Sequence, residues 1–377
     1  MKKIRFKDEL FKYLEENNIT NKEFANRIDI TPKHLIDIMA GTRDLSSQII
    51  ENISMVTPFT IEYIYNIETN YKFEEMVQNY LKKENTTLEK YLNKFNYKYL
   101  IKENIINSTS DKTQILKDIL KYLRVPTIDK LYKIDKINNE KIELVLLWLE
   151  NCYKEALKQS IKKYKKENIK NLIKYISNCA KEGIFNEEEL IQKFNDNGIY
   201  LVIKEDIFDL NINGAVKVNK GVPFIYLTLK ETLIADIYFK ILYQLAHIKT
   251  NLNKAQSMTI LTYENEYEKN IENQAYNWMV DDEYYMNVCS RKYYDIENEK
   301  KYPKSFVVYR LAKNKIISYG SEEYKKYNTS IKWKKHQKSS KISSKWKKLL
   351  FSYKNSIMYI GDACDRKKRI FKFFNKT

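Results

Sequence analysis

Hydrophobic residues recur at helical spacing through the first 70 residues, in segments separated by turn and capping signals. Helices are predicted over 7–17, 45–55 and 59–66, and two more lie within 20–41. Helices this short gain most of their stability from packing an apolar face against neighbours. The pattern therefore predicts a domain of five packed helices over residues 1–70.

The segment 20–41 carries helix start and stop signals in a consistent order. Thr20 with Glu23 matches a capping box, which satisfies free backbone N–H groups at a helix start. Thr31 followed by Pro32 is an N-cap with proline at the first helical position, and Gly41 stands where a left-handed C-cap ends a helix. These signals predict two helices joined by a tight turn, as in a helix-turn-helix DNA-binding motif. A generic helical hairpin is the alternative.

Apolar and polar residues of this segment divide onto opposite faces. The apolar positions expected to pack inside are Phe24, Ala25, Ile28, Ile30, Leu35 and Ile38. Polar residues at or just after the start of the second helix are candidates for contacts with base edges: Thr31, Lys33, His34 and Asp37. Phosphate contacts are expected near the helix ends, from Asn21, Lys22 and Arg43. His34 either contacts a base or packs against the domain.

The stretch from residue 71 to 195 has an almost continuous helical pattern. Turns are expected near Asn107–Asp111, Val125–Pro126 and Asn138–Glu140. The lysine-rich run at 161–175 is interpreted as an exposed basic helix. We therefore expect a helical middle region over 71–195.

The character of the sequence changes after residue 195. Two segments rich in Ile, Val, Tyr and Leu, 199–205 and 222–229, are predicted to be strands, with Asn213–Gly214 and Gly221 as turn residues between them. Helices are expected next, over about 232–249 and 263–280. The predicted fold class is thus mainly α, with a smaller α+β domain over 196–330.

Composition favours a soluble protein of a reducing cytoplasm. The chain has 377 residues and no apolar run near the ~20 residues that a bilayer span needs, nor a recognisable signal peptide. Its four cysteines are scattered and none lies in a C-x-x-C pair, which argues against a disulfide framework or a zinc ribbon.

The formal net charge of +18 is unevenly distributed. Residues 1–70 hold 9 Lys and Arg against 11 Asp and Glu, whereas residues 331–377 hold 15 against 2. The last segment also contains Trp333, Trp346, Phe351, Tyr353, Phe371, Phe373 and Phe374. Such a basic aromatic tail could follow a phosphate backbone, or it could be a solvated extension. The slightly acidic first domain predicts weak DNA binding on its own.

The first part of the chain resembles a known family of DNA-binding proteins. Residues 4–72, from IRFKDELFKYLEENNITNKEFANRIDITPKHLIDIMAG to YIYNIETNYK, resemble the XRE-type helix-turn-helix of HigA antitoxins, which has a five-helix, lambda-repressor-like fold. Residues 91–125 and 302–319 resemble the linker and the tail of long HigA-like proteins fused to a second domain. The similarity covers about residues 4–325.

The second domain resembles the ImmA/IrrE family of zinc peptidases. GAVKVNKGVPFIYLTL is similar to that family's strands, and IYFKILYQLAH is similar to its H-E-x-x-H helix. In that motif two histidines on one helical face hold Zn²⁺, the intervening Glu activates a water, and a later helix supplies a third ligand. The matching positions here are Tyr243, Gln244 and His247, with Glu272 as the distal candidate.

These positions depart from the family's pattern. A phenol with a pKa of about 10 is not an ordinary zinc ligand at neutral pH, and an amide does not act as a general base. His247 and Glu272 alone would hold zinc weakly. With these substitutions, the resemblance implies a zincin-like fold with no catalytic residue and no cofactor. His247 is then a packed, hydrogen-bonded histidine, a remnant metal ligand, or part of a small polar pocket with its three neighbours.

The resemblance implies a transcriptional repressor of its own operon and an antitoxin for a RelE-like toxin encoded beside it. A single recognition helix covers few base pairs, so a homodimer on a palindromic operator is expected. Two alternatives remain: a prophage-type regulator whose C-terminal domain senses a ligand or protein partner, and an active metallopeptidase with unusual ligands.

Overall fold

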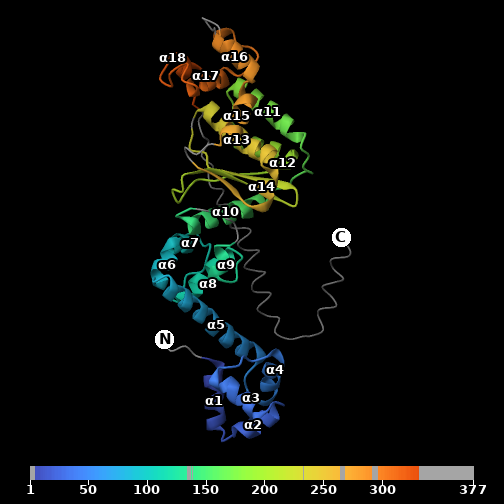
Figure 1. Ribbon diagram of the computed structural model, residues 1–377, viewed down its shortest axis with the longest axis vertical. Coiled ribbons are helices and arrows are strands. Elements are labelled where there is room, and N and C mark those ends of the chain that lie inside the picture. Colours follow the sequence, from blue (N-terminus) through green and yellow to red (C-terminus); the bar gives the residue numbers. More distant parts are fainter. Residues whose placement is uncertain are drawn as a thin grey trace. The chain divides into compact units, whose positions relative to one another are not determined.

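The protein is mainly helical and contains one small mixed sheet (Figure 1). This confirms the coarse class predicted from the sequence. The basic segment 331–377, with its aromatic residues, lies outside the described residues. The computed structural model describes residues 5–133, 137, 139–231, 233–263, 268–290 and 296–330. Over these ranges no helix has both the length and the apolar character needed to cross a bilayer.

Five helices form the N-terminal region around one hydrophobic core. They are α1 (Phe6–Glu16), α2 (Asn21–Arg27), α3 (Pro32–Ala40), α4 (Ser47–Val56) and α5 (Ile61–Lys83). Phe6, Leu10 and Leu14 of α1 pack there with apolar residues of the other four helices. The number and order of helices over the first 70 residues are as predicted.

Helix α5 is much longer than the predicted segment 59–66. Nothing in residues 67–83 breaks a helix, because the stretch contains no glycine or proline. The predicted boundary at residue 70 therefore falls inside a continuous helix, whose first half packs with the N-terminal core through Ile64 and whose second half packs elsewhere through Val77 and Leu81.

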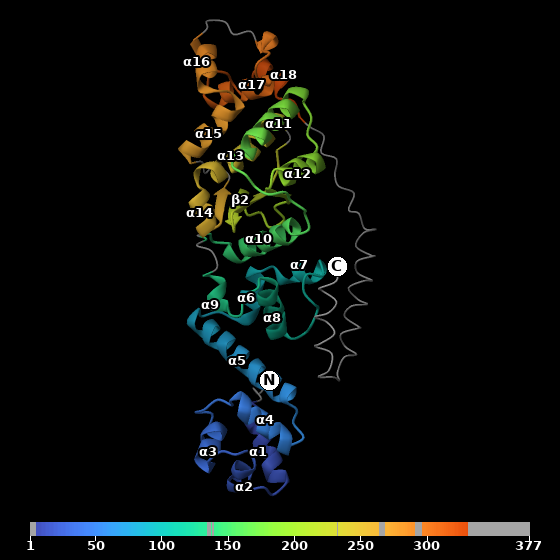
Figure 2. The ribbon, with the colours of Figure 1, turned by 90° about the vertical axis from the view of Figure 1, so that its right-hand side faces the viewer.

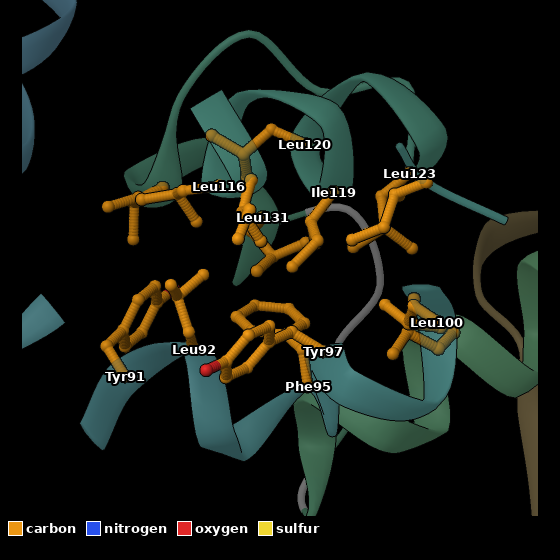
Figure 3. Close-up of a cluster of buried hydrophobic side chains, with 14 of the residues drawn as sticks. Tyr91, Leu92, Phe95, Tyr97, Leu100, Leu116, Ile119, Leu120, Leu123 and Leu131 are labelled. Atoms are coloured by element: carbon orange, nitrogen blue, oxygen red, sulfur yellow. The ribbon is translucent and has the colours of Figure 1, made fainter. Parts of the chain in front are cut away.

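A second core forms around four short helices of the middle region. These are α6 (Leu88–Lys94), α7 (Tyr97–Lys102), α8 (Lys112–Tyr122) and α9 (Ile128–Leu131). Figure 3 shows side chains of α6 and α7, among them Leu92 and Tyr97, facing Leu116 and Ile119 of α8. The predicted turns at 107–111 and 125–126 lie between helices. The third predicted turn includes Asn138, which is outside the described residues.

Three more helices follow: α10 (Ile142–Ala156), α11 (Asn168–Glu182) and α12 (Glu187–Asp196). The expected basic helix at 161–175 is only partly helical, since residues 161–165 have no regular structure and α11 begins at Asn168. Lys162 N–H donates to the Asn195 carbonyl at 2.9 Å, and Asn168 Nδ2 donates to the Asn197 carbonyl at 3.0 Å. These tertiary bonds hold the segment against the end of α12 in place of helix.

The sheet has four strands in the order β1-β3-β2-β4. The strands are β1 (Tyr200–Ile203), β2 (Ile212–Asn219), β3 (Val222–Leu227) and β4 (Ile260–Tyr263). β1 runs parallel to β3, and β2 is antiparallel to both β3 and β4. Lys220 and Gly221 both have positive φ, which matches the two-residue turn of a tight β2–β3 hairpin.

The expected turn at Asn213–Gly214 is wrong, because both residues lie within β2. The register with β4 shifts between Ile212 and Gly214, so the pair forms a bulge. A Cβ on Gly214 would lie 2.6 Å from the Tyr226 carbonyl oxygen and 3.0 Å from Gln244 Nε2. The glycine is needed for this close approach. The pattern of apolar residues predicted neither β2 nor β4, and residues 214–219 of β2 were indicated only by the resemblance to a family's strands.

Helices cover both faces of the sheet. Apolar residues of α10, including Trp148 and Cys152, pack against Ala215 and Phe224. On the other face lies α13 (Ile234–Thr250), whose Gln244 approaches Gly214. Figures 1 and 2 both show the sheet between α10 and α13. The predicted helix 232–249 corresponds to α13.

Helices complete the described part of the chain. They are α14 (Leu252–Ser257), α15 (Lys269–Met279), α16 (Asp282–Ser290), the short 3-10 helix η1 (Ile296–Asn298), α17 (Lys304–Lys313) and α18 (Glu322–Tyr327). α15 and α17 both pack against α13, partly through rings of Tyr276 and Tyr309 around Phe239. The predicted helix 263–280 corresponds to α15, which begins at Lys269; Tyr263 belongs to β4, and residues 264–267 lie outside the described residues.

Candidate nucleic-acid interface and the degenerate metal-site positions

Helix α3 begins and ends as its sequence signals predict. The Thr31 hydroxyl accepts the His34 backbone N–H at 3.2 Å, and Pro32 occupies the first helical position. At the other end Gly41 has φ of 78°, and its N–H donates to the Ile38 carbonyl at 2.9 Å. The helix is therefore fixed at both ends by local bonds.

Helix α2 shows half of the predicted capping box. The Thr20 hydroxyl accepts the Glu23 backbone N–H at 3.2 Å. The Glu23 carboxylate does not return to the N-cap but pairs with Arg27, one turn further along. An ion pair at this i,i+4 spacing is an ordinary feature of an exposed helix face.

The predicted apolar face of the two helices is confirmed. Phe24 and Leu35 are at most 1% exposed, and they share the N-terminal core with Ala25, Ile28 and Ile38. Ile30 is half-buried against the same core. Packing of this face leaves the opposite side of α3 outward.

The four candidate base contacts of α3 lie on or near that outer side. Thr31 and Lys33 are exposed, whereas His34 and Asp37 are half-buried. The Thr31 hydroxyl already serves as the cap, and the Asp37 backbone carbonyl accepts bonds from Thr42. Lys33 is thus the candidate whose side chain is least engaged within the protein. The half-burial of His34 is consistent with packing against the domain.

The three candidate phosphate contacts, Asn21, Lys22 and Arg43, are exposed. Within the described ranges, Lys22 and Arg43 form no ion pair with a carboxylate, and neither does Lys33. Nearby acids are neutralised instead, since Glu23 pairs with Arg27 and Asp44 with Lys72 at 2.9 Å.

Sequence reasoning missed Ile36, which is 54% exposed on α3. It lies three residues after Lys33, and positions three apart share one face of a helix. An exposed aliphatic side chain there suits contact with a thymine methyl group. A helical projection of 32–40 would have found it, because every other isoleucine or leucine of α3 is buried.

Four residues match the zinc-motif positions of the resemblance described above and are called the degenerate metal-site positions. They occur on two neighbouring helices. Tyr243, Gln244 and His247 lie on α13, and Glu272 lies on α15. The Tyr243 and His247 rings are in edge contact, with centroids 4.9 Å apart. Every residue from 241 to 248 is buried, so these side chains face the interior.

Gln244 is fully buried and bonded to the sheet. Its Nε2 donates to Thr262 Oγ1 at 2.8 Å, and that hydroxyl donates to the Gly214 carbonyl at 3.1 Å. Its Oε1 has no hydrogen-bond partner among the described residues. This side chain connects α13 to two strands and does not point along the helix toward His247.

Glu272 is occupied by other groups. Its carboxylate accepts the Tyr276 hydroxyl at 3.3 Å and lies 3.5 Å from Lys313 Nζ on α17. Over the described part of the chain it makes no hydrogen bond to Tyr243, Gln244 or His247. The polar pocket considered from the sequence is therefore not a single bonded cluster of these four residues.

His247 is a neutral, buried histidine. Burial lowers its pKa to about 4, an effect that Glu268 partly opposes. Its Nδ1 lies 3.3 Å from Asn251 Nδ2, a donor, so Nδ1 accepts and the ring proton resides on Nε2. That Nε2 is buried without a partner in the described residues.

These contacts do not fit a zinc site. The Tyr243 hydroxyl accepts the Glu268 backbone N–H at 3.0 Å, Gln244 faces the sheet, and Glu272 has a lysine beside it. Nowhere in the described ranges do three or more His, Cys, Asp or Glu side chains form a group able to hold a metal ion.

Comparison with known proteins gives no further information on either site. The chain matches no protein-family model, no curated protein and no solved structure.

Proposed function

We propose that the chain is a cytoplasmic DNA-binding transcriptional repressor, bacterial or prophage-encoded. We propose further that it is the antitoxin of a HigBA-type toxin–antitoxin module and autoregulates its operon. Residues 1–70 are proposed to be a lambda-repressor-like DNA-binding domain. Residues 196–330 are proposed to be a zincin-like domain without peptidase activity.

One observation carries the DNA-binding part of this proposal. α3 is capped at both ends, packed on one side, and exposes Lys33 and Ile36 on the other. A rigid helix with polar and aliphatic side chains free on one face is what major-groove recognition requires. Lys22 and Arg43, which have no carboxylate partner in the described ranges, supply the phosphate contacts of the proposal.

Specific binding in this proposal needs two copies of α3. A two-fold dimer would place its recognition helices about 34–36 Å apart, one turn of the double helix. The operator is then palindromic.

The loss of peptidase activity rests on the residues at the motif positions. Gln244 cannot accept a proton in the relevant pH range, and its amide is bonded to Thr262. His247 remains as a buried neutral ring. These residues stabilise the interior in our proposal and take no part in chemistry.

The test is footprinting of the full-length protein on its own upstream DNA at two salt concentrations. We expect a protected palindrome, weakened by Lys33→Ala and Ile36→Ala. Removing a base contact costs about 1–3 kcal/mol and relaxes specificity at one position. Lys12→Ala is the matched control, because Lys12 is an exposed lysine of α1 that pairs with Glu16 on the same helix.

Protection that is sequence-blind and equally sensitive to Lys12→Ala would overturn the DNA-binding proposal. The antitoxin part is tested separately, by co-purification with any small basic protein encoded beside the gene. A neighbour that is toxic alone and neutralised by this chain supports it, and a neighbour that never binds contradicts it.

The second candidate is a regulator whose C-terminal region senses a ligand. A cavity among α11, α13, α14 and α15 favours it. DNA binding that a ligand alters, without any toxin partner, would select this alternative.

A further inference from the structure

A cavity of about 250 Å³ opens among α11, α13, α14 and α15, apart from the degenerate metal-site positions. Figure 2 shows α11 lying beside α13, and α14 and α15 also lie next to α13. The floor is aliphatic and includes Ile169 and Ile248, which are buried. Two aromatic side chains, Tyr164 and Trp278, complete the apolar lining.

Three lysines also line this cavity: Lys166, Lys170 and Lys249. All three are exposed, and within the described ranges none of them pairs with a carboxylate. Lys249 Nζ lies 5.2 Å from the centroid of the Trp278 ring, a cation–π distance that places the ammonium beside the indole. An apolar floor with an uncompensated positive rim favours an anion that also has an apolar part.

The wall that carries Tyr164 and Lys166 is held in place by α12 and the residues after it. Gly198 has φ of 79°, and a Cβ there would lie 2.4 Å from the Tyr164 backbone. Lys162 Nζ pairs with Asp196 at 3.0 Å, and Asn168 Nδ2 bonds the Asn197 carbonyl. The cavity is thus lined by a segment fixed through tertiary bonds, which argues for a preformed site.

We propose that this cavity binds a small aromatic phosphate, a nucleotide, with its ring against the apolar lining and its phosphate on the three lysines. Lysine ammonium groups act as point charges that suit phosphate, whereas the bidentate geometry that arginine offers to carboxylates is absent from the lining. Trp278 offers an aromatic wall, and base–aromatic contact tolerates any base.

The volume limits the ligand to one nucleotide unit. Pockets for drug-sized ligands span about 300–1,000 Å³, and this cavity lies just below that range. The same chemistry is met by a free mononucleotide and by one nucleotide of a single strand. The inference goes beyond the DNA-recognition proposal, because the cavity lies far along the chain from α3 and its test contains no operator DNA.

The experiment is isothermal titration of the full-length protein with AMP, CMP, adenosine, inorganic phosphate and octanoate, and with a 5′-phosphorylated pentanucleotide. We expect AMP and CMP to bind more tightly than adenosine or phosphate, and binding to weaken as salt rises. Lys166→Ala with Lys170→Ala should weaken binding about tenfold or more. Trp278→Ala should weaken it about fivefold or more.

Lys165→Ala is the matched control, because Lys165 is exposed and adjacent to Lys166 but does not line the cavity. It should change affinity by less than about twofold. The same lysine variants separate the cavity from the basic segment 331–377, which they leave intact.

Tighter binding of the pentanucleotide than of AMP, lost in the same variants, would support the site and assign it to a strand. Three results would overturn the proposal: equal affinity for adenosine and AMP, equal affinity for phosphate and AMP, or equal affinity for octanoate and AMP. Nucleotide binding that survives the double lysine variant would overturn it as well. Since no operator DNA is present, none of these results bears on α3.

Discussion

Polar residues in the two regions of greatest interest are used in opposite ways. On α3, Lys33 is exposed and without an ion pair to any described carboxylate, while the apolar residues of the helix pack. On α13, Gln244 and His247 are at most 1% exposed. A motif position therefore indicates a partner contact only where its side chain is left exposed.

The packing of the two helices explains this contrast. α3 is amphipathic and rests on a single core, so one face stays in contact with solvent. α13 lies between the sheet and helices α11, α15 and α17, and its residues 241–248 are buried on every side, whereas Lys249 near its end is exposed and lines the cavity. A helix covered all round has no face for a partner, so contacts in that region are expected at cavities such as the lysine-rimmed one.

The largest expected effect concerns neighbours on α3 that face opposite ways. Leu35→Ala should lower the free energy of unfolding of the N-terminal region by about 2–5 kcal/mol, because Leu35 is fully buried. Ile36→Ala should change it by less than about 0.5 kcal/mol, since that side chain is half exposed. Hydrogen–deuterium exchange of peptides from α1 to α4 in the full-length protein measures both.

Equal destabilisation by Ile36→Ala and Leu35→Ala would contradict the assignment of Ile36 to the exposed face of α3. That result would place Ile36 in a buried interface, for example between two copies of the chain. A stable Leu35→Ala protein would mean that the core of the N-terminal region is not the one described.

The N-terminal region was predictable because its signals are local. Thr31 and Gly41 each fix one end of α3 through bonds to residues at most four positions away, and Pro32 supplies the fixed φ of the first helical position. Helix periodicity then identified the packed residues. The exposed Ile36 was the exception, since its role depends on which side of α3 the rest of the domain covers.

The sheet region was less predictable because its determinants are far apart in sequence. Asn213–Gly214 has the composition of a turn, yet it forms a bulge in β2 because Gln244 and Tyr226 approach it from later elements. The internal use of Glu272 depends likewise on Lys313, 41 positions later in the chain. Such long-range pairings leave no local pattern.

Gly214→Ala tests this close approach and should have the second-largest effect. The added methyl would meet the Tyr226 carbonyl oxygen and Gln244 Nε2, so backbone or side chain must shift. We expect a loss of about 1–3 kcal/mol, typical of overpacking. Gly320→Ala is the control, because the nearest atom to its new Cβ would be Ser318 Oγ at 3.6 Å.

Hydrogen–deuterium exchange of peptides from β2, β3 and β4 in the full-length protein measures the stability loss in the Gly214 variant. Faster exchange confined to the strands and α13 is expected. No change at Gly214 together with faster exchange at Gly320 would contradict the bulge geometry.

The buried histidine predicts a pH effect of similar size. Its folded pKa is about 4 against an ordinary value of 6.5, so the unfolded chain takes up the proton first as pH falls. The stability that comes from the neutral ring is complete above pH 6.5 and is lost as pH falls toward 4. Between pH 7 and 5 the loss should be about 2 kcal/mol.

Urea unfolding at pH 7 and pH 5, compared between the wild type and His247→Gln, measures this difference. Glutamine does not titrate, so the variant should show a smaller fall in stability at pH 5 while other groups titrate alike in both proteins. An identical fall in the two proteins would mean that His247 is accessible to protons in the folded state.

The smallest effect concerns the Thr31 cap, and it tests whether a single local bond positions the proposed recognition helix. Thr31→Ala leaves the His34 N–H without its acceptor and should cost about 1 kcal/mol. Thr31→Ser keeps a hydroxyl and should restore most of it. Exchange at the first turn of α3 measures the loss, and footprinting with the same variants measures any effect on DNA. If serine restores stability but not DNA binding, the threonine methyl contacts the DNA, whereas recovery of both would assign Thr31 to the cap alone.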